Sequence, residues 1–308
     1  MLRLLRVRLP WLIVTLFGIS VLTFVLIHLV PGGPFRELEG GGRALSPEVV
    51  ARIEKFYGLD KPLWEQYLIY IGHAIRGDFG RSLLDNESVL VLLMQGLPVS
   101  AQLGAMAVVV AILIGIPLGV FAAVYRNSWI DHLATGISIL GITVPSFVLG
   151  FVLIIVFALW LDWLPVAGWS GWPYKVMPVI ALSMEPIALF ARYTRASLQD
   201  VLNQLYVIVA KSKGLAPGII LLRHALKNAL IPVVTVLGLV IPHLIVGSFL
   251  IETVFAVPGT GRFFVTSISR RDYPVVMGIT MLFAAIVALA NLLADMLYAW
   301  LDPRIQYE

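Results

Sequence analysis

Few side chains in this sequence are spaced for covalent chemistry. Ser248 and His243 lie in one apolar stretch, where a serine and a histidine can in principle act as nucleophile and general base. Their separation along the chain places them on poorly aligned faces of a helix, so we expect no such pair. His243 has no second histidine or carboxylate at metal-ligand spacing, and the sequence contains no cysteine. The sequence therefore predicts neither a catalytic group nor a metal site.

A nucleotide site of the P-loop type is also missing from the sequence. The pattern GxxxxGK[ST], whose backbone amides hold phosphates, does not occur in it. We expect this chain to bind no cofactor. If ATP drives the protein, a separate polypeptide must bind the ATP and magnesium and hydrolyse the nucleotide.

The strongest candidate for an interaction site is a cationic segment that contains a glycine. It reads Tyr206-Val207-Ile208-Val209-Ala210-Lys211-Ser212-Lys213-Gly214-Leu215 and is followed by Arg223-His224-Ala225-Leu226-Lys227-Asn228-Ala229-Leu230-Ile231-Pro232. Gly214 permits a positive φ, Ala210 has almost no side chain, and Pro217 suits the first turn of a helix. Two short helices bent about Gly214 would form a knob that fits a groove in a partner. The alternative is a cationic loop that only sets the orientation of the protein in a membrane.

The composition shows which elements must position these residues. Of 308 residues, 59% are hydrophobic and 13% are charged, whereas soluble domains contain about 25% charged residues. The runs Val99–Ala123 and Leu133–Trp160 contain no Asp, Glu, Lys or Arg, and each exceeds the roughly 20 residues that a membrane helix needs. The net charge of +4 is spread along the loops, which favours positive-inside topology over nucleic-acid binding. The sequence predicts an all-α polytopic membrane protein.

Six membrane spans are predicted, at about 10–30, 99–123, 134–160, 177–198, 229–251 and 276–300. The first stretch follows Arg3, Arg6 and Arg8 as a signal peptide would. It is longer than the roughly 7–15 apolar residues of a signal peptide and lacks a small-x-small cleavage site, so we expect it to be retained. The lysines and arginines of the short loops predict that both termini are cytoplasmic.

Residues 31–98 are predicted to form a structured insert outside the membrane. Ser46-Pro47-Glu48 combines a helix N-cap, a proline at the first helical position and an acid that favours the helix dipole. A second helical pattern begins after Pro62 and ends at Arg76-Gly77-Asp78, and residues 88–97 form a third short apolar piece. We therefore divide the chain into 1–30, the insert 31–98, and a five-helix core 99–308.

Polar residues within the predicted spans have two possible roles. Glu185, followed by Pro186, either lines a substrate pathway or is a buried hydrogen-bonding group beside a proline kink. Asn291 and Asp295 share one helix face, where interhelical contacts are the more frequent role. The run Gly115-Ile116-Pro117-Leu118-Gly119 is typical of close helix packing.

Several motifs resemble those of one transporter family and occur along nearly the whole chain. They are Pro31–Phe35, Tyr57–Pro62, Gly77–Gly80, Val144–Phe147, Leu164–Trp169, Glu252–Phe255, Pro258–Gly261 and Asp302–Ile305. In this order they resemble ABC importer permeases of the oligopeptide and dipeptide transporter family, most of all the oligopeptide permeases. Ala210, Gly214 and Ile231-Pro232 resemble that family's cytoplasmic coupling loop. Leu205 and Ile208-Val209 depart from its pattern, which usually has an acid before Tyr206 and Arg-Thr after Val207.

The resemblance implies a fold, partners and site residues. It implies six transmembrane helices of the type I ABC importer permease architecture, with an extracytoplasmic insert after the first span and a cytoplasmic coupling loop at 199–228. Partners would be a second homologous permease subunit, two cytoplasmic ATPase subunits that hold ATP and Mg, an extracytoplasmic peptide-binding protein, and the peptide. The membrane would be the bacterial cytoplasmic (inner) membrane. The residues expected at the ATPase contact are Tyr206, Ala210, Lys211, Lys213, Gly214, Leu215, Arg223 and His224, with Glu185 in the translocation pathway.

The implied function is ATP-driven uptake of oligopeptides, with no chemistry on this chain. Dipeptides, glutathione and nickel chelates are alternative substrates within the same family. An ion-coupled secondary transporter is a more distant alternative, because the sequence shows no convincing inverted repeat and few charges within its spans.

Overall fold

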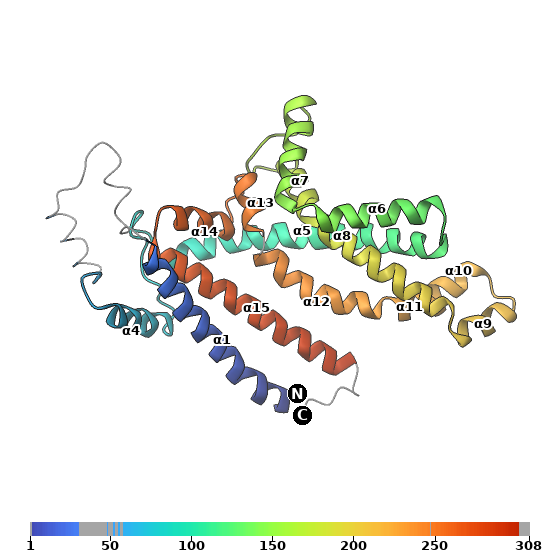
Figure 1. Ribbon diagram of the computed structural model, residues 1–308, viewed down its shortest axis with the longest axis horizontal. Helices are drawn as coiled ribbons and strands as arrows, with labels where there is room; N and C mark the ends of the chain where they lie inside the picture. Colours follow the sequence, from blue (N-terminus) through green and yellow to red (C-terminus); the bar gives the residue numbers. More distant parts are fainter. Residues whose placement is uncertain are drawn as a thin grey trace. The chain divides into compact units, whose positions relative to one another are not determined.

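The computed structural model describes residues 2–30, 48, 52, 55, 58–246 and 248–301. Their helices, drawn in Figure 1, are α1 (Leu2–Leu29), α4 (Leu63–Ala74), α5 (Val89–Val124), α6 (Trp129–Thr143), α7 (Ser146–Leu153), the π-helix η1 (Ile154–Trp160), α8 (Trp172–Leu202), α9 (Leu205–Ser212), α10 (Pro217–Ile219), the π-helix η2 (Ile220–Ala225), α11 (Leu226–Ala229), α12 (Ile231–Val246), α13 (Phe249–Val254), α14 (Thr260–Ser269) and α15 (Tyr273–Leu301). The predicted all-α class is confirmed. The motifs at Pro31–Phe35 and Asp302–Ile305, the helix start at Ser46-Pro47, and Tyr57 lie outside the described residues.

Four described helices are long and apolar enough to cross a membrane, and the number rises to six if each of two bent helix pairs is one span. The four are α1, α5, α8 and α15. The bent pairs are 129–143 with 146–160 and 217–229 with 231–242. The six predicted spans correspond to these six elements.

The third predicted span is not the continuous helix that its uncharged run suggested. One half is α6, and the other is α7 continued by η1. The two halves meet at an angle of 105°. The cause is Pro145, because a proline disfavours α-helical geometry in the residue before it. Val144 accordingly has an extended backbone, with φ of −84° and ψ of 117°.

The prediction of a separate apolar piece at residues 88–97 is wrong. Helix α5 begins at Val89 and runs without a break through Gly96 and Pro98 to Val124. Val89 and Leu93 are buried, and burial of these side chains stabilises the first turns of the long helix. In contrast, the helical pattern predicted after Pro62 is confirmed by α4.

The described chain divides into two compact units. Unit 1 contains residues 1–99 and 258–289, and unit 2 contains residues 100–257 and 290–308. In unit 2 the backbones of α5 and α8 approach closely: a Cβ atom added to Gly115 would lie 2.8 Å from the carbonyl oxygen of Ile187. A Cβ on Gly119 would likewise collide with Ala191. The predicted small-residue packing is confirmed, with α8 as the partner.

In unit 1 a buried carboxylate fastens the loop after α4 to the start of α15. Asp272 is buried and accepts hydrogen bonds from the hydroxyl of Ser82 and from the backbone N–H of Leu83, the latter at 3.1 Å. Arg270 forms an exposed ion pair with Asp85 of the same loop, at 3.2 Å. The two interactions join segments that are distant in sequence.

Replacement of Asp272 by alanine should loosen this loop. The change leaves the amide of Leu83 and the hydroxyl of Ser82 without their buried acceptor, at a cost of about 1–3 kcal/mol in unfolding free energy. Asp272→Asn is the matched control, because its amide oxygen can still accept from the backbone N–H of Leu83, so we expect a smaller loss than in Asp272→Ala. Proteolysis of loop 75–88 at rising temperature measures the difference, and equal cleavage of Asp272→Ala and wild type would contradict the role of this carboxylate.

The same carboxylate predicts a pH dependence. Burial raises the pKa of Asp272 above its ordinary value of 3.8, although the bonds from Ser82 and Leu83 oppose the shift. Since the folded-state pKa is the higher one, ionisation opposes folding, and stability should fall as pH rises from below 3.8 through the folded-state pKa. This loss should be absent in Asp272→Asn, which does not ionise.

Candidate functional site

The cationic segment forms two short helical pieces joined by a glycine turn, as predicted. Helix α9 ends at Ser212, and Gly214 follows in the left-handed region with φ of +74°. The N–H of Gly214 donates to the carbonyl of Lys211 at 3.0 Å, which satisfies one carbonyl of the last helical turn. Pro217 then occupies the first turn of α10.

A small core holds this segment together. Val207 and Ala210 of α9 pack with Ile220 of η2, and all three are buried. Ala210 is only 6% exposed, so its small side chain allows η2 to approach α9 within the segment itself. A contact between the Ala210 side chain and a partner would require a rearrangement of this core.

A second cluster attaches the segment to the long helices of unit 2. Ala225 and Ala229 are buried against Leu198 of α8 and Ala123 of α5. Figure 1 shows α9, α10 and α11 together at the end of α8 that is remote from α7 and α13. A force on this segment would therefore act on α8 and α5 through packed side chains.

The segment exposes several apolar side chains, and basic side chains are exposed along the same stretch of chain. We call the apolar set the loop surface; it consists of the exposed residues Leu205, Ile208, Val209, Leu215, Ile219 and Leu222. Leu222 is 66% exposed. Four exposed basic residues of the sequence prediction lie in the same segment: Lys211, Lys213, Arg223 and His224. An exposed apolar cluster among charges is typical of a protein-contact site.

Tyr206 also belongs to this segment. It is exposed, and its hydroxyl accepts a hydrogen bond of 2.9 Å from the side-chain amide of Asn228 in α11. This bond ties the start of α9 to the end of the segment. The sequence-predicted residues Tyr206, Lys211, Lys213, Gly214, Leu215, Arg223 and His224 are thus exposed in one segment, and Ala210 supports them from within.

An ion pair near this segment could not be predicted from the sequence. The guanidinium of Arg195 on α8 makes two hydrogen bonds to the carboxylate of Asp131 on α6, of 2.5 and 2.9 Å. Asp131 is only 2% exposed and also accepts from the backbone N–H of Asn127 at 3.0 Å. The available signal in the sequence was Asp131 itself, an acid in the first turn of the apolar helix α6. Its partner is distant in sequence, so no spacing rule identifies it.

Glu185 is exposed in the chain taken by itself, although its neighbour Pro186 is buried. The interpretation as a buried hydrogen-bonding group within this chain is therefore not supported, and its place in a pathway stays a prediction. Asn291 is also exposed, while the side chains of Asp295 and His243 lie outside the described residues. Within the part of the chain that the structure describes, no group of three His, Cys, Asp or Glu could hold a metal ion.

Comparison with known proteins assigns the chain to a family. Two family models match it: the N-terminal membrane component of binding-protein-dependent transport systems at residues 1–104, and the inner membrane component of these systems at residues 115–307. The dipeptide transport system permease protein DppB of Bacillus subtilis is 44% identical over 293 residues, which are 95% of this chain and 94% of that protein. The glutathione transport system permease protein GsiC of Escherichia coli K12 is 40% identical, with 98% of each chain covered. The oligopeptide transport system permease protein OppB of Haemophilus influenzae is 41% identical, with 95% of each covered.

Solved structures agree at the level of the fold. The methionine ABC transporter MetNI, in inward-facing conformations, matches 69% of this chain and 97% of its own, with a TM-score of 0.56 and 17% identity. The crystal structure of an amino acid ABC transporter with histidines matches 70% of this chain and 94% of its own, with a TM-score of 0.50 and 20% identity. The ABC importer permease fold expected from the sequence motifs is thereby confirmed, with four to six candidate spans among the described residues. The chain belongs to the family of inner membrane components of binding-protein-dependent transport systems and is an ABC importer permease of the peptide-transport type.

Proposed function

We propose that this chain is one of two membrane subunits through which an ATP-driven importer passes short peptides. The observation that supports this most is the loop surface, an exposed apolar face held by its own core at the end of α8. Two cytoplasmic ATPase subunits bind there, in this proposal, and supply the ATP and Mg that the chain itself does not bind. The loop and both termini are then cytoplasmic.

The mechanism follows from the packing of the segment. Closure of the two ATPase subunits on ATP draws the two coupling segments together. Because Ala225 and Ala229 pack against α8 and α5, the movement reaches the helices that would line the pathway. The pathway then opens outward to a binding protein loaded with peptide, and hydrolysis reverses the change. The chain performs no covalent step.

The substrate is a short peptide in this proposal. Relatives between 40% and 44% identical are named for dipeptides, glutathione and oligopeptides. The oligopeptide preference that the motifs suggested is therefore no better supported than a dipeptide preference.

Uptake by proteoliposomes tests the proposal. The chain is reconstituted with its permease partner, ATPase subunits and binding protein, and labelled dipeptide, glutathione and pentapeptide are offered separately. We expect uptake only with hydrolysable ATP, and the ranking of the three substrates gives the specificity. Uptake driven by a proton or sodium gradient without ATP would contradict the proposal and favour a secondary transporter.

Substitution of Gly214 by leucine should uncouple ATP hydrolysis from transport. The residue has φ of +74°, and no atom lies within 4 Å of the position of an added Cβ. The change thus creates no steric clash within the chain but strains the turn by about 1–2 kcal/mol and adds bulk to the docking knob. We expect peptide-stimulated ATPase activity to fall by about tenfold or more, with normal membrane insertion.

Gly214→Asn is the matched control for this turn, because asparagine tolerates the left-handed conformation better than leucine. It should retain more activity than Gly214→Leu. Wild-type transport and ATPase stimulation in Gly214→Leu would show that this turn is not part of the ATPase contact.

Glu185→Gln should change which charged peptides are taken up. Glutamine keeps the shape and hydrogen-bonding capacity of the side chain but removes the charge, and an exposed carboxylate within a span is expected to face water or a polar partner. Competition uptake with cationic and anionic peptides measures the effect at equal complex abundance. An unchanged ranking of charged peptides would remove Glu185 from the pathway.

A further inference from the structure

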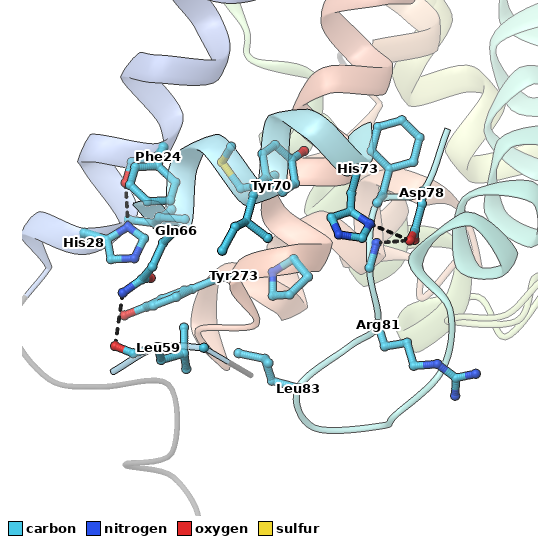
Figure 2. Close-up of a pocket in the computed structure, with 17 residues that line it drawn as sticks. Phe24, His28, Leu59, Gln66, Tyr70, His73, Asp78, Arg81, Leu83 and Tyr273 are labelled. Atoms are coloured by element: carbon cyan, nitrogen blue, oxygen red, sulfur yellow. Dashed lines mark hydrogen bonds and ion pairs between the residues drawn. The ribbon is translucent and has the colours of Figure 1, made fainter. Parts of the chain in front are cut away.

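Unit 1 contains a cavity of about 270 Å³ that the transport proposal does not use. Among the described residues, it is lined by the end of α1, by α4 and the loop that follows, and by the start of α15. Figure 2 shows His28 at one side of this cavity and Asp78 with Arg81 at the other. Its volume lies just below the roughly 300 Å³ at which small-molecule pockets begin, so it suits a ligand the size of one side chain.

His28 offers a hydrogen-bond acceptor in this cavity. Its Nδ1 atom lies 2.8 Å from the carbonyl oxygen of Phe24, and a carbonyl only accepts, so Nδ1 must carry the proton. In the neutral ring Nε2 is then an acceptor. Nε2 is buried and has no hydrogen-bond partner among the residues that the structure describes.

Tyr70 adds a second unused polar atom. Its hydroxyl is buried, and no described residue forms a hydrogen bond with it. Burial raises the pKa of Tyr70, so its phenol stays protonated and can both donate and accept. On the opposite side of the cavity, the carboxylate of Asp78 already has hydrogen-bond partners. It accepts from the backbone N–H of Gly80 at 2.9 Å and pairs with the Nδ1 atom of His73 at 3.1 Å. Among the described residues of the lining, the buried side-chain atoms that lack a hydrogen-bond partner are Nε2 of His28 and the hydroxyl of Tyr70.

The walls favour an aromatic occupant. The rings of Phe24 and His28 have centroids 4.2 Å apart, and those of His28 and Tyr273 are 5.0 Å apart. Leu59 and Met277 complete the lining with apolar surface. Aromatic rings pack favourably at such separations.

The chemistry of the occupant follows from these two features together. A lipid acyl chain would leave Nε2 of His28 and the hydroxyl of Tyr70 buried and unpaired, which is unfavourable. An inorganic ion would face largely apolar walls. An aromatic ring can pack against the aromatic and apolar walls, and an O–H or N–H group on that ring can donate to Nε2 of His28. We propose that this cavity binds a small aromatic ligand with such a donor, a phenol or an indole, whose O–H or N–H donates to Nε2 of His28.

Two probes that differ by one hydroxyl test the proposal without any need for transport. The complete complex in nanodiscs is titrated with N-acetyl-tyrosinamide and with N-acetyl-phenylalaninamide, and saturable binding is followed by saturation-transfer NMR. We expect the tyrosine probe to bind about five to ten times more tightly, as one added hydrogen bond predicts. Failure of this result leaves the transport proposal untouched, because the cavity lies outside the coupling segment.

Variants of the chain locate the binding. His28→Phe keeps an aromatic ring beside Phe24 and Tyr273 but removes the acceptor, so both probes should then bind alike. Tyr70→Phe keeps the shape of the cavity and should weaken binding of the tyrosine probe. Tyr125→Phe removes an exposed hydroxyl in unit 2, at a residue that belongs neither to the cavity lining nor to the proposed ATPase contact, and should leave binding of both probes unchanged. Equal affinity of the wild-type protein for both probes, no saturable binding, or a preference for the tyrosine probe that survives His28→Phe would overturn the proposal.

Discussion

Glutamate in place of Leu222 or Ile208 should abolish ATP-driven peptide uptake and leave the amount of protein in the membrane unchanged. Both side chains are exposed on the loop surface, so the substitutions disturb no core of this chain. Against an apolar groove of an ATPase subunit, the new carboxylate would be buried without a partner. Such a charge costs about 3–5 kcal/mol, which corresponds to a loss of roughly 100-fold or more in affinity.

Leu205→Glu is the matched control for this prediction. Leu205 belongs to the same surface and is 74% exposed, but the coupling-loop pattern that this segment resembles has an acid just before Tyr206. We therefore expect Leu205→Glu to retain uptake. Binding of purified ATPase subunits to each variant, measured alongside uptake, separates lost docking from lost transport. Equal behaviour of all three glutamate variants would contradict a specific contact at Ile208 and Leu222.

Replacement of Arg195 by alanine should cause the largest loss of stability. The change leaves the carboxylate of Asp131 buried, and among the described residues the backbone N–H of Asn127 is the hydrogen-bond donor that remains. Removal of one member of a buried pair costs about 3–5 kcal/mol, and we expect the lower end because Arg195 is itself one-third exposed. Thermal unfolding of the purified complex in detergent measures the loss.

An exposed pair provides the comparison. In unit 1, Nζ of Lys61 lies 2.7 Å from Oε1 of Glu65, and both side chains are solvent-accessible. Lys61→Ala should cost less than about 0.5 kcal/mol, as is typical of surface pairs. The double variant Asp131→Leu with Arg195→Leu should be more stable than Arg195→Ala, because it leaves no unpaired charge. A loss for Arg195→Ala no greater than that for Lys61→Ala would contradict the structural role of the buried pair.

The local features of the cationic segment around Gly214 could be predicted from the sequence, because they depend on neighbouring residues. The turn at Gly214 and the helix start at Pro217 follow from backbone preferences of single residue types. Helix α4 follows from the apolar spacing after Pro62. Each of these predictions required only a few consecutive positions.

The remaining features depend on tertiary contacts or on the balance of competing signals. The uncharged run 133–160 satisfied every length criterion for one helix, and only the backbone restriction at Pro145 bends it by 105°. Helix α5 continues through Gly96 and Pro98 because burial of its first turns outweighs the local preference of these residues for a break. The role of Ala210 depends on Ile220, which packs on it from another helix.

Protection of a single thiol on the loop surface tests the central claim most directly. The natural chain has no cysteine, so Leu222→Cys and, as control, Glu48→Cys each introduce the only thiol on this subunit; both parent positions are exposed. Maleimide labelling is measured in inside-out membrane vesicles and in intact cells, with the ATPase subunits present or stripped away. We predict that Leu222→Cys reacts only from the cytoplasmic side and is protected by the ATPase subunits, and that Glu48→Cys reacts only from outside. Labelling of Leu222→Cys at the same rate with and without the ATPase subunits, or from outside, would contradict the assignment of this surface as the site where ATP hydrolysis is coupled to transport.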